Sequence, residues 1–131
     1  MSWYVANAIL YFRFEDGNQD VIPVWENLYL IEAGSPDEAL SKATVRARED
    51  EGDDSASLTY NGRKCSRVCV GIRKVTSCVN EDERPEDGTE VTYNEFQLDS
   101  LESLHRLARG EPTMLEYEAA EPPRATLDSP P

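Results

Sequence analysis

The first third of the chain alternates apolar and polar side chains with the period of two that is typical of β-strands. Residues 3–14 predict one strand whose even-numbered side chains form the core face. These are Tyr4, Ala6, Ala8, Leu10, Phe12 and Phe14. Residues 21–33 predict a second strand, which begins at a sheet edge because Pro23 cannot donate a ladder hydrogen bond. Its expected core residues are Ile22, Val24, Leu28 and Leu30, and the other face carries Trp25, Asn27, Tyr29 and Ile31.

A helix is expected directly after the second strand. Ser35 suits the N-cap, Pro36 suits the first helical position, and Glu38 completes a Ser-x-x-Glu capping box. The apolar stripe of this helix consists of Ala39, Leu40, Ala43 and Ala47. Because these side chains are mostly small, the helix can pack closely onto a sheet.

Asn61-Gly62 is the strongest turn signal in the chain, and it predicts a hairpin. A short strand over 58–60 precedes the turn, and a long strand runs from 63 to about 78. Even-numbered residues of the long strand are expected in the core, namely Val68, Val70 and Ile72.

The last third predicts a strand over 90–97, a second helix and a short strand over 113–118. The second helix is opened by Asp99, and its inward side chains are Leu101, Leu104, Leu107 and Ala108. The order is therefore β-β-α-β-β-β-α-β, an α+β fold with a largely antiparallel sheet and both helices on one sheet face. We expect a single domain over residues 1–118. Residues 119–131 predict an acidic, proline-rich, disordered tail.

Several segments together resemble the family called domain of unknown function 4288, over roughly residues 3–97. They are Trp3-Tyr4-x-Ala6, Trp25, the sequence AGSPDEALSKA at 33–43, Val70-Gly71-Ile72 and the sequence DGTEV at 87–91. The resemblance implies a small bacterial α+β protein, and it brings no known activity, cofactor or ligand.

Charge narrows the range of partners. The 131 residues include 26 acidic and 13 basic side chains, which gives a net charge of −13. Such a balance disfavours nucleic-acid phosphates and anionic membrane surfaces, and it is compatible with a basic protein partner. We expect a cytoplasmic protein, because no signal-peptide pattern is evident and the three cysteines do not form a disulfide framework.

No motif for catalysis or metal binding is present. The sequence contains no phosphate-binding glycine loop, nucleophile elbow or His-Glu-x-x-His pattern. His105, the only histidine, is expected on a helix surface. Cys65 and Cys69 would lie roughly 13 Å apart along one strand, which splays them too far for a zinc site. We therefore expect no catalytic residue, cofactor or metal, although an enzyme built from scattered carboxylates would show no motif and stays an alternative.

The sheet face opposite the helices is the predicted binding surface. It is expected to present Trp3, Tyr11, Trp25, Tyr29, Arg67 and Arg73. Trp, Tyr and Arg are enriched in interface hot spots. We expect a non-enzymatic module that binds another protein or a second copy of itself through this face. The alternatives are an immunity-type inhibitor of a basic toxin, or aromatic cross-strand pairs that only stabilise the sheet.

Overall fold

The computed structural model describes residues 1–52, 58–78 and 84–117. Within these residues the elements are β1 (Ser2–Phe14), β2 (Val24–Ala33), α1 (Pro36–Glu49), β3 (Thr59–Tyr60), β4 (Arg63–Ser77), β5 (Phe96–Gln97), α2 (Leu101–Ala108) and β6 (Glu116–Tyr117). The fold is α+β and its element order is the predicted one. The predicted tail lies outside the described residues.

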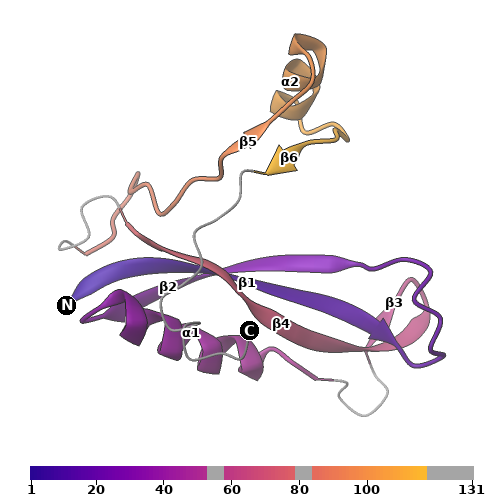
Figure 1. Ribbon diagram of the computed structural model, residues 1–131, viewed down its shortest axis with the longest axis horizontal. Coiled ribbons are helices and arrows are strands. Elements are labelled where there is room, and N and C mark those ends of the chain that lie inside the picture. The colour runs from indigo at the N-terminus through magenta and orange to yellow at the C-terminus, as the bar shows by residue number, and fades with distance from the viewer. Residues whose placement is uncertain (53–57, 79–83, 118–131) are drawn as a thin grey trace, which may run out of the picture.

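Strand β1 is the centre of the main sheet, whose order is β2-β1-β4-β3 (Figure 1). All of its pairings are antiparallel. Partners of β1 extend from Ala33 back to Val24 on one side and from Ser77 back to Cys65 on the other. Because β1 is paired along both edges, its backbone hydrogen bonds are satisfied inside the fold.

Helix α1 covers one face of the main sheet (Figure 1). It begins as predicted, with the Ser35 side chain accepting a hydrogen bond from the backbone N–H of Glu38 at 3.1 Å. Ala39, Ala43 and Ala47 are fully buried against the sheet. Their small side chains let the helix backbone approach the strands closely. The predicted core residues Tyr4, Leu10, Phe12 and Leu40 are all buried.

The predicted orientation of β2 is wrong. Leu10 lies opposite Trp25, so the odd-numbered residues of β2 share the helix-covered face with the even-numbered residues of β1. Leu28 and Leu30, expected in the core, point to the other face and are 48% and 44% exposed. The cause is that β2 carries large apolar side chains on both faces, so that its period alone cannot decide which face is buried.

The predicted orientation of β4 is wrong in part. Two β-bulges, with Arg73 and Val70 as the extra residues, interrupt its pairing with β1. Each bulge adds one residue and reverses the alternation. Ile72 therefore packs against the helix-side core, whereas Val68 pairs with Tyr11 on the opposite face. Val70 is 66% exposed.

Residues 96–117 form a separate unit of β5, α2 and β6, which we call the arm. Strands β5 and β6 pair antiparallel in a small second sheet. The expectation that both helices pack on one sheet face is wrong, because the arm stands off from the main sheet on the side opposite α1 (Figure 1). The apolar stripe of α2 is consequently not part of the main core.

Candidate functional site

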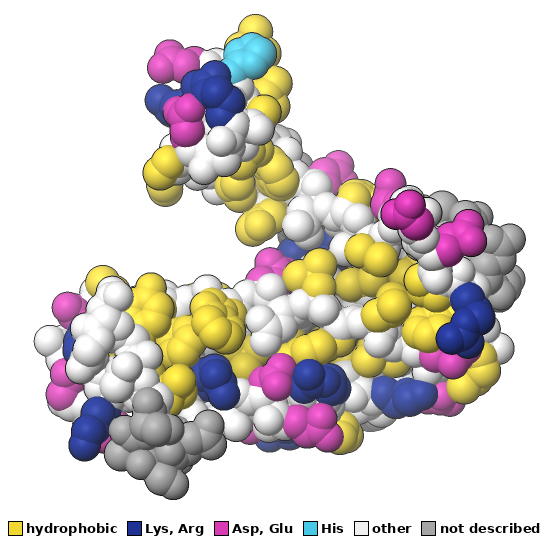
Figure 2. Space-filling model, turned by 180° about the vertical axis from the view of Figure 1, so that it is seen from behind, with side chains coloured by type: hydrophobic (Ala, Val, Ile, Leu, Met, Phe, Trp, Pro, Cys, Tyr) yellow, Lys and Arg dark blue, Asp and Glu magenta, His cyan; other side chains and the backbone are white. Residues whose placement is uncertain are grey.

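The main sheet has one face without a helix, which we call the open face. Its apolar part lies on β2, where Val24, Leu28 and Leu30 are each about half exposed. The neighbouring β1 side chains Ile9 and Tyr11 are partly buried on the same face. Figure 2 shows hydrophobic side chains along the body of the protein and on the arm, which stands clear of that body. A soluble chain seldom leaves such apolar area in water without a use for it.

A polar network lies at the centre of the open face. Asn7 is fully buried there, and its Nδ2 donates a hydrogen bond to Oε2 of Glu26 at 3.1 Å. The same carboxylate oxygen accepts a hydrogen bond from Nε of Arg73 at 2.6 Å. Oδ1 of Asn7 has no hydrogen-bond partner among the described residues. A largely buried ion pair of this kind is weak evidence for stability, because the cost of desolvating the two charges offsets much of their attraction.

This network also holds the root of the arm. The Arg73 guanidinium lies 5.0 Å from the centre of the Tyr117 ring, and its Nη2 donates a hydrogen bond to Oδ1 of Asn94 at 3.4 Å. Beside it, Nζ of Lys74 donates to the backbone carbonyl of Tyr93 at 2.6 Å. Burial, together with the neighbouring Arg73 charge, lowers the pKa of Lys74. The segment that leads into the arm is therefore fastened to the open face at two adjacent β4 residues.

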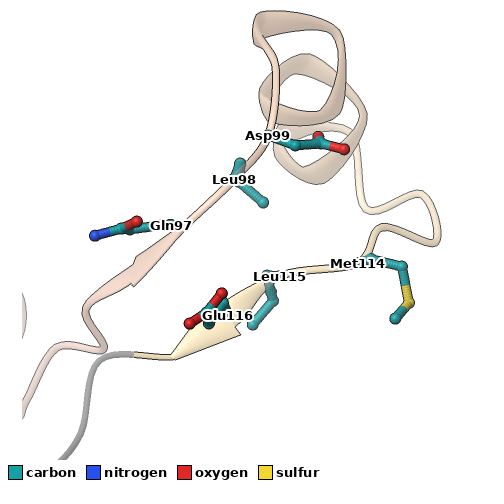
Figure 3. A pocket seen from close by; sticks show the side chains of 6 residues that line it. All are labelled: Gln97, Leu98, Asp99, Met114, Leu115 and Glu116. Carbon is teal, nitrogen blue, oxygen red and sulfur yellow. The ribbon is translucent and has the colours of Figure 1, made fainter.

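The arm carries its own exposed apolar surface. Leu101 and Leu104, one helical turn apart on α2, are 73% and 46% exposed, and Met114 is 88% exposed. Between β5 and β6 lies a hollow of about 410 Å³, lined by Gln97, Leu98, Asp99, Met114, Leu115 and Glu116 (Figure 3). Leu98 points into the space between the two chain segments (Figure 3).

The two carboxylates of this hollow do not form a catalytic pair. Asp99 accepts a hydrogen bond from the Ser103 hydroxyl at 2.7 Å, which lowers the pKa of Asp99 and fastens the first turn of α2. Glu116 projects from β6 on the other side of the hollow (Figure 3). The hollow therefore offers an apolar contact, and its acids do not converge on a common point.

The six predicted binding residues are divided between the two faces of the sheet. Trp3, Tyr11 and Arg73 lie on the open face, as expected. The other three, Trp25, Tyr29 and Arg67, lie on the helix-covered side because the orientations of β2 and of this part of β4 are the reverse of those predicted. Leu28 and Leu30 were missed for the same reason, since they occupy the open-face positions assigned to the aromatic residues.

The three displaced residues have structural partners. Trp25 packs edge-on against Phe12, with ring centres 5.0 Å apart. The Tyr29 hydroxyl donates to the Asp50 carboxylate, and Nε of Arg67 donates to the Asp50 backbone carbonyl at 2.8 Å. Burial and the Asp50 contact raise the pKa of Tyr29, while the hydrogen bonds from Tyr29 and Arg46 lower that of Asp50. The contacts of Tyr29 and Arg67 with Asp50 fasten the end of α1 to the sheet.

No cluster of metal-ligating side chains occurs in residues 1–52, 58–78 and 84–117. Cys65 and Cys78 are buried, Cys69 is partly buried, and none forms a disulfide. Burial raises the pKa of Cys65 and Cys69, which disfavours the reactive thiolate. His105 lies exposed on α2.

The fold and this surface define a class: an antiparallel sheet with a helix on one face and no helix on the other. The chain belongs to the family described as Domain of unknown function (DUF4288), whose model matches residues 3–93. The match includes all of the main sheet except its first residue, Ser2, and ends before the arm. No curated protein and no solved structure matches the chain. Neither helix in the described part of the chain has the length and apolar character needed to cross a membrane.

Proposed function

We propose that this protein is a non-enzymatic protein-binding module whose contact surface is the open face together with the arm. The observation that carries the proposal is the exposure of the β2 side chains Val24, Leu28 and Leu30 on a sheet face that has no helix over it. A sheet with two apolar faces is stable in water only when a second layer covers each of them. In this proposal a partner supplies the layer that α1 supplies on the other face.

The carboxylates favour binding over catalysis. Four carboxylates of the main sheet region are engaged in structural contacts: Glu26 with Arg73, Asp50 with Tyr29 and Arg46, Asp16 and Asp20 with Arg63. A carboxylate enzyme needs two such groups directed at one substrate atom with different pKa values. Acids that are each paired with an arginine, at three separate places in the fold, do not supply that arrangement.

Local charge favours a partner other than a basic toxin. Although the chain carries a net charge of −13, the open face presents Arg13, Arg73 and Lys74 against Glu26 and Glu32. A strongly basic partner would meet these cations and gain little from the overall negative charge. The three free cysteines support a location in the reducing cytoplasm.

The test compares two substitutions of similar chemistry on opposite sides of the fold. In the open-face variant, Leu28→Asp and Leu30→Asp are combined. The control is Val45→Asp, since Val45 is 62% exposed on α1. Both proteins should keep the circular dichroism spectrum of the wild type. Only the open-face variant should lose the associations seen by sedimentation velocity and by affinity capture on the purified, tagged chain. Unchanged association in that variant would refute the proposal.

A further inference from the structure

Building on the proposed function, we propose that the open face is covered by the arm of a second copy of this chain. Two copies would exchange arms reciprocally, each laying the Leu101 and Leu104 side of α2 on the Leu28 and Leu30 region of its partner. The two surfaces are of matching kind. One is a helix with an uncovered apolar stripe, and the other is a sheet face without a helix.

Helix α1 shows how such a contact is built on this sheet. Its stripe packs on the helix-covered face through residues spaced three and four apart. Leu101 and Leu104 have the same kind of spacing, and the partly buried Leu107 extends the stripe by another turn. Because a sheet has two faces, a second amphipathic helix completes the three-layer arrangement of helix, sheet and helix.

The arm does not cover its own sheet with this stripe. Its root is fastened by the contacts of Arg73 with Asn94 and Tyr117, and by that of Lys74 with Tyr93. From this anchored root α2 projects away from the sheet, as Figures 1 and 2 show. As long as the anchor holds, the stripe is directed outward and is available to another molecule.

Charge complementarity favours a second copy as that molecule. The arm contains four carboxylates, those of Asp99, Glu102, Glu111 and Glu116, against two arginines. Both arginines are paired inside the arm, Arg106 with Glu102 at 3.5 Å and Arg109 with Glu111 at 2.6 Å. The arm is therefore net acidic, whereas the open face is net basic, with Arg13, Arg73 and Lys74 against Glu26 and Glu32.

The twofold symmetry of the proposed dimer strengthens the association. An isologous twofold arrangement forms the same contact twice, so a single helix-on-sheet contact of modest size contributes doubly to the dimer. A different partner would need its own helix of this type and would leave the arm of this chain uncovered. The second copy satisfies both exposed surfaces at once.

The test uses two variants that damage opposite halves of the contact. Leu28→Lys alters the sheet face and Leu104→Glu alters the arm, and Val45→Glu serves as the control on α1. Wild type and control should sediment as dimers. Each test variant alone should weaken dimerisation by about 30-fold or more, the size of an interface hot spot. All these positions are substantially exposed in the single chain, so the folded monomer tolerates the changes.

The equimolar mixture of the two variants is decisive. In the proposed dimer, the intact arm of the Leu28→Lys chain fits the intact face of the Leu104→Glu chain, and the remaining contact sets Glu against Lys. The mixture should therefore form a heterodimer although neither component dimerises alone. Pairing of arm with arm, of sheet with sheet, or of β2 edge with β2 edge would give no such rescue.

Other outcomes overturn the inference in distinguishable ways. A monomeric wild type rejects the second copy as the occupant of the open face. The protein-binding proposal is then tested separately, by affinity capture of other proteins through Leu28 and Leu30. Loss of dimerisation in both variants without rescue in the mixture rejects arm exchange and keeps self-association. A dimer unaffected by either substitution rejects both surfaces.

Discussion

Leu10→Ala is the sharpest test of the helix-side core. Leu10 lies in the middle of β1, opposite Trp25 on one side and Cys69 on the other, and it is only 1% exposed. Its side chain packs in a cluster with Ala8 and Ala47. These two buried neighbours are small and belong to a paired strand and a closely packed helix, so their side chains cannot reach into the space that leucine leaves.

The expected loss of stability follows from two terms. Removing three buried carbon atoms costs about 2.4 kcal/mol at roughly 0.8 kcal/mol each. A cavity that does not collapse adds on the order of 1 kcal/mol, which gives a total of about 3–4 kcal/mol. In urea unfolding followed by tryptophan fluorescence, the midpoint should fall by about 2 M for a slope near 1.5–2 kcal/mol/M.

Val70→Ala is the matched control on a neighbouring strand. Because Val70 is an exposed bulge residue, its truncation should change the free energy of unfolding by less than about 0.5 kcal/mol. Equal effects in the two variants, or a loss below about 1 kcal/mol for Leu10→Ala, would refute the assignment of the core to the face under α1.

Three further predictions concern the termini of α1 and the tail. Ser35→Ala should lower the free energy of unfolding by about 1 kcal/mol, because it removes the hydrogen-bond acceptor for the Glu38 N–H. Ser35→Asp should be nearly as stable as the wild type, and equal stability of all three proteins would contradict this role of Ser35. The pKa of Asp50 is lowered from 3.8, so its contribution to stability is present above pH 3.8 and is lost as pH falls through the depressed value. Asp50→Asn should therefore flatten the pH dependence of the unfolding midpoint in acid, and an unchanged slope would show that the carboxylate contributes nothing. Deletion of residues 119–131, whose proline-rich sequence has few apolar side chains to bury, should leave the melting temperature nearly unchanged, whereas a marked fall would mean that the tail docks.

Local signals made part of this fold predictable. The Ser35 cap fixed the start of α1, because a side chain and a backbone N–H three residues apart need no distant partner. The hairpin turn is equally local: Asn61 and Gly62 both have positive φ, 50° and 81°, which is the conformation that an Asn-Gly hairpin turn requires. Helix starts and hairpin turns depend only on residues that are close in the sequence. Their positions can therefore be predicted from the sequence alone.

Strand orientation depends on neighbours, and there the pattern was insufficient. The even face of β1 is uniformly apolar and was assigned correctly. In β2 both faces are apolar, and the pairing of Leu10 with Trp25 decides which one is buried. In β4 the bulges at Val70 and Arg73 reverse the alternation, and nothing in the composition of the strand marks them. One wrong orientation exchanged Trp25 and Tyr29 for Leu28 and Leu30 on the open face.

The position of the arm has a physical explanation that the apolar pattern does not contain. Amphipathicity shows that α2 will cover something, but it does not identify the surface that α2 covers. That choice depends on Arg73, which is brought onto the open face as a bulge residue and fastens Asn94 and Tyr117 there. The region that defines the family ends at residue 93, so the open face lies inside it and the arm outside. If the arms are exchanged as proposed, pairing of this chain is carried by residues beyond the family region, acting on a sheet face that the family region provides.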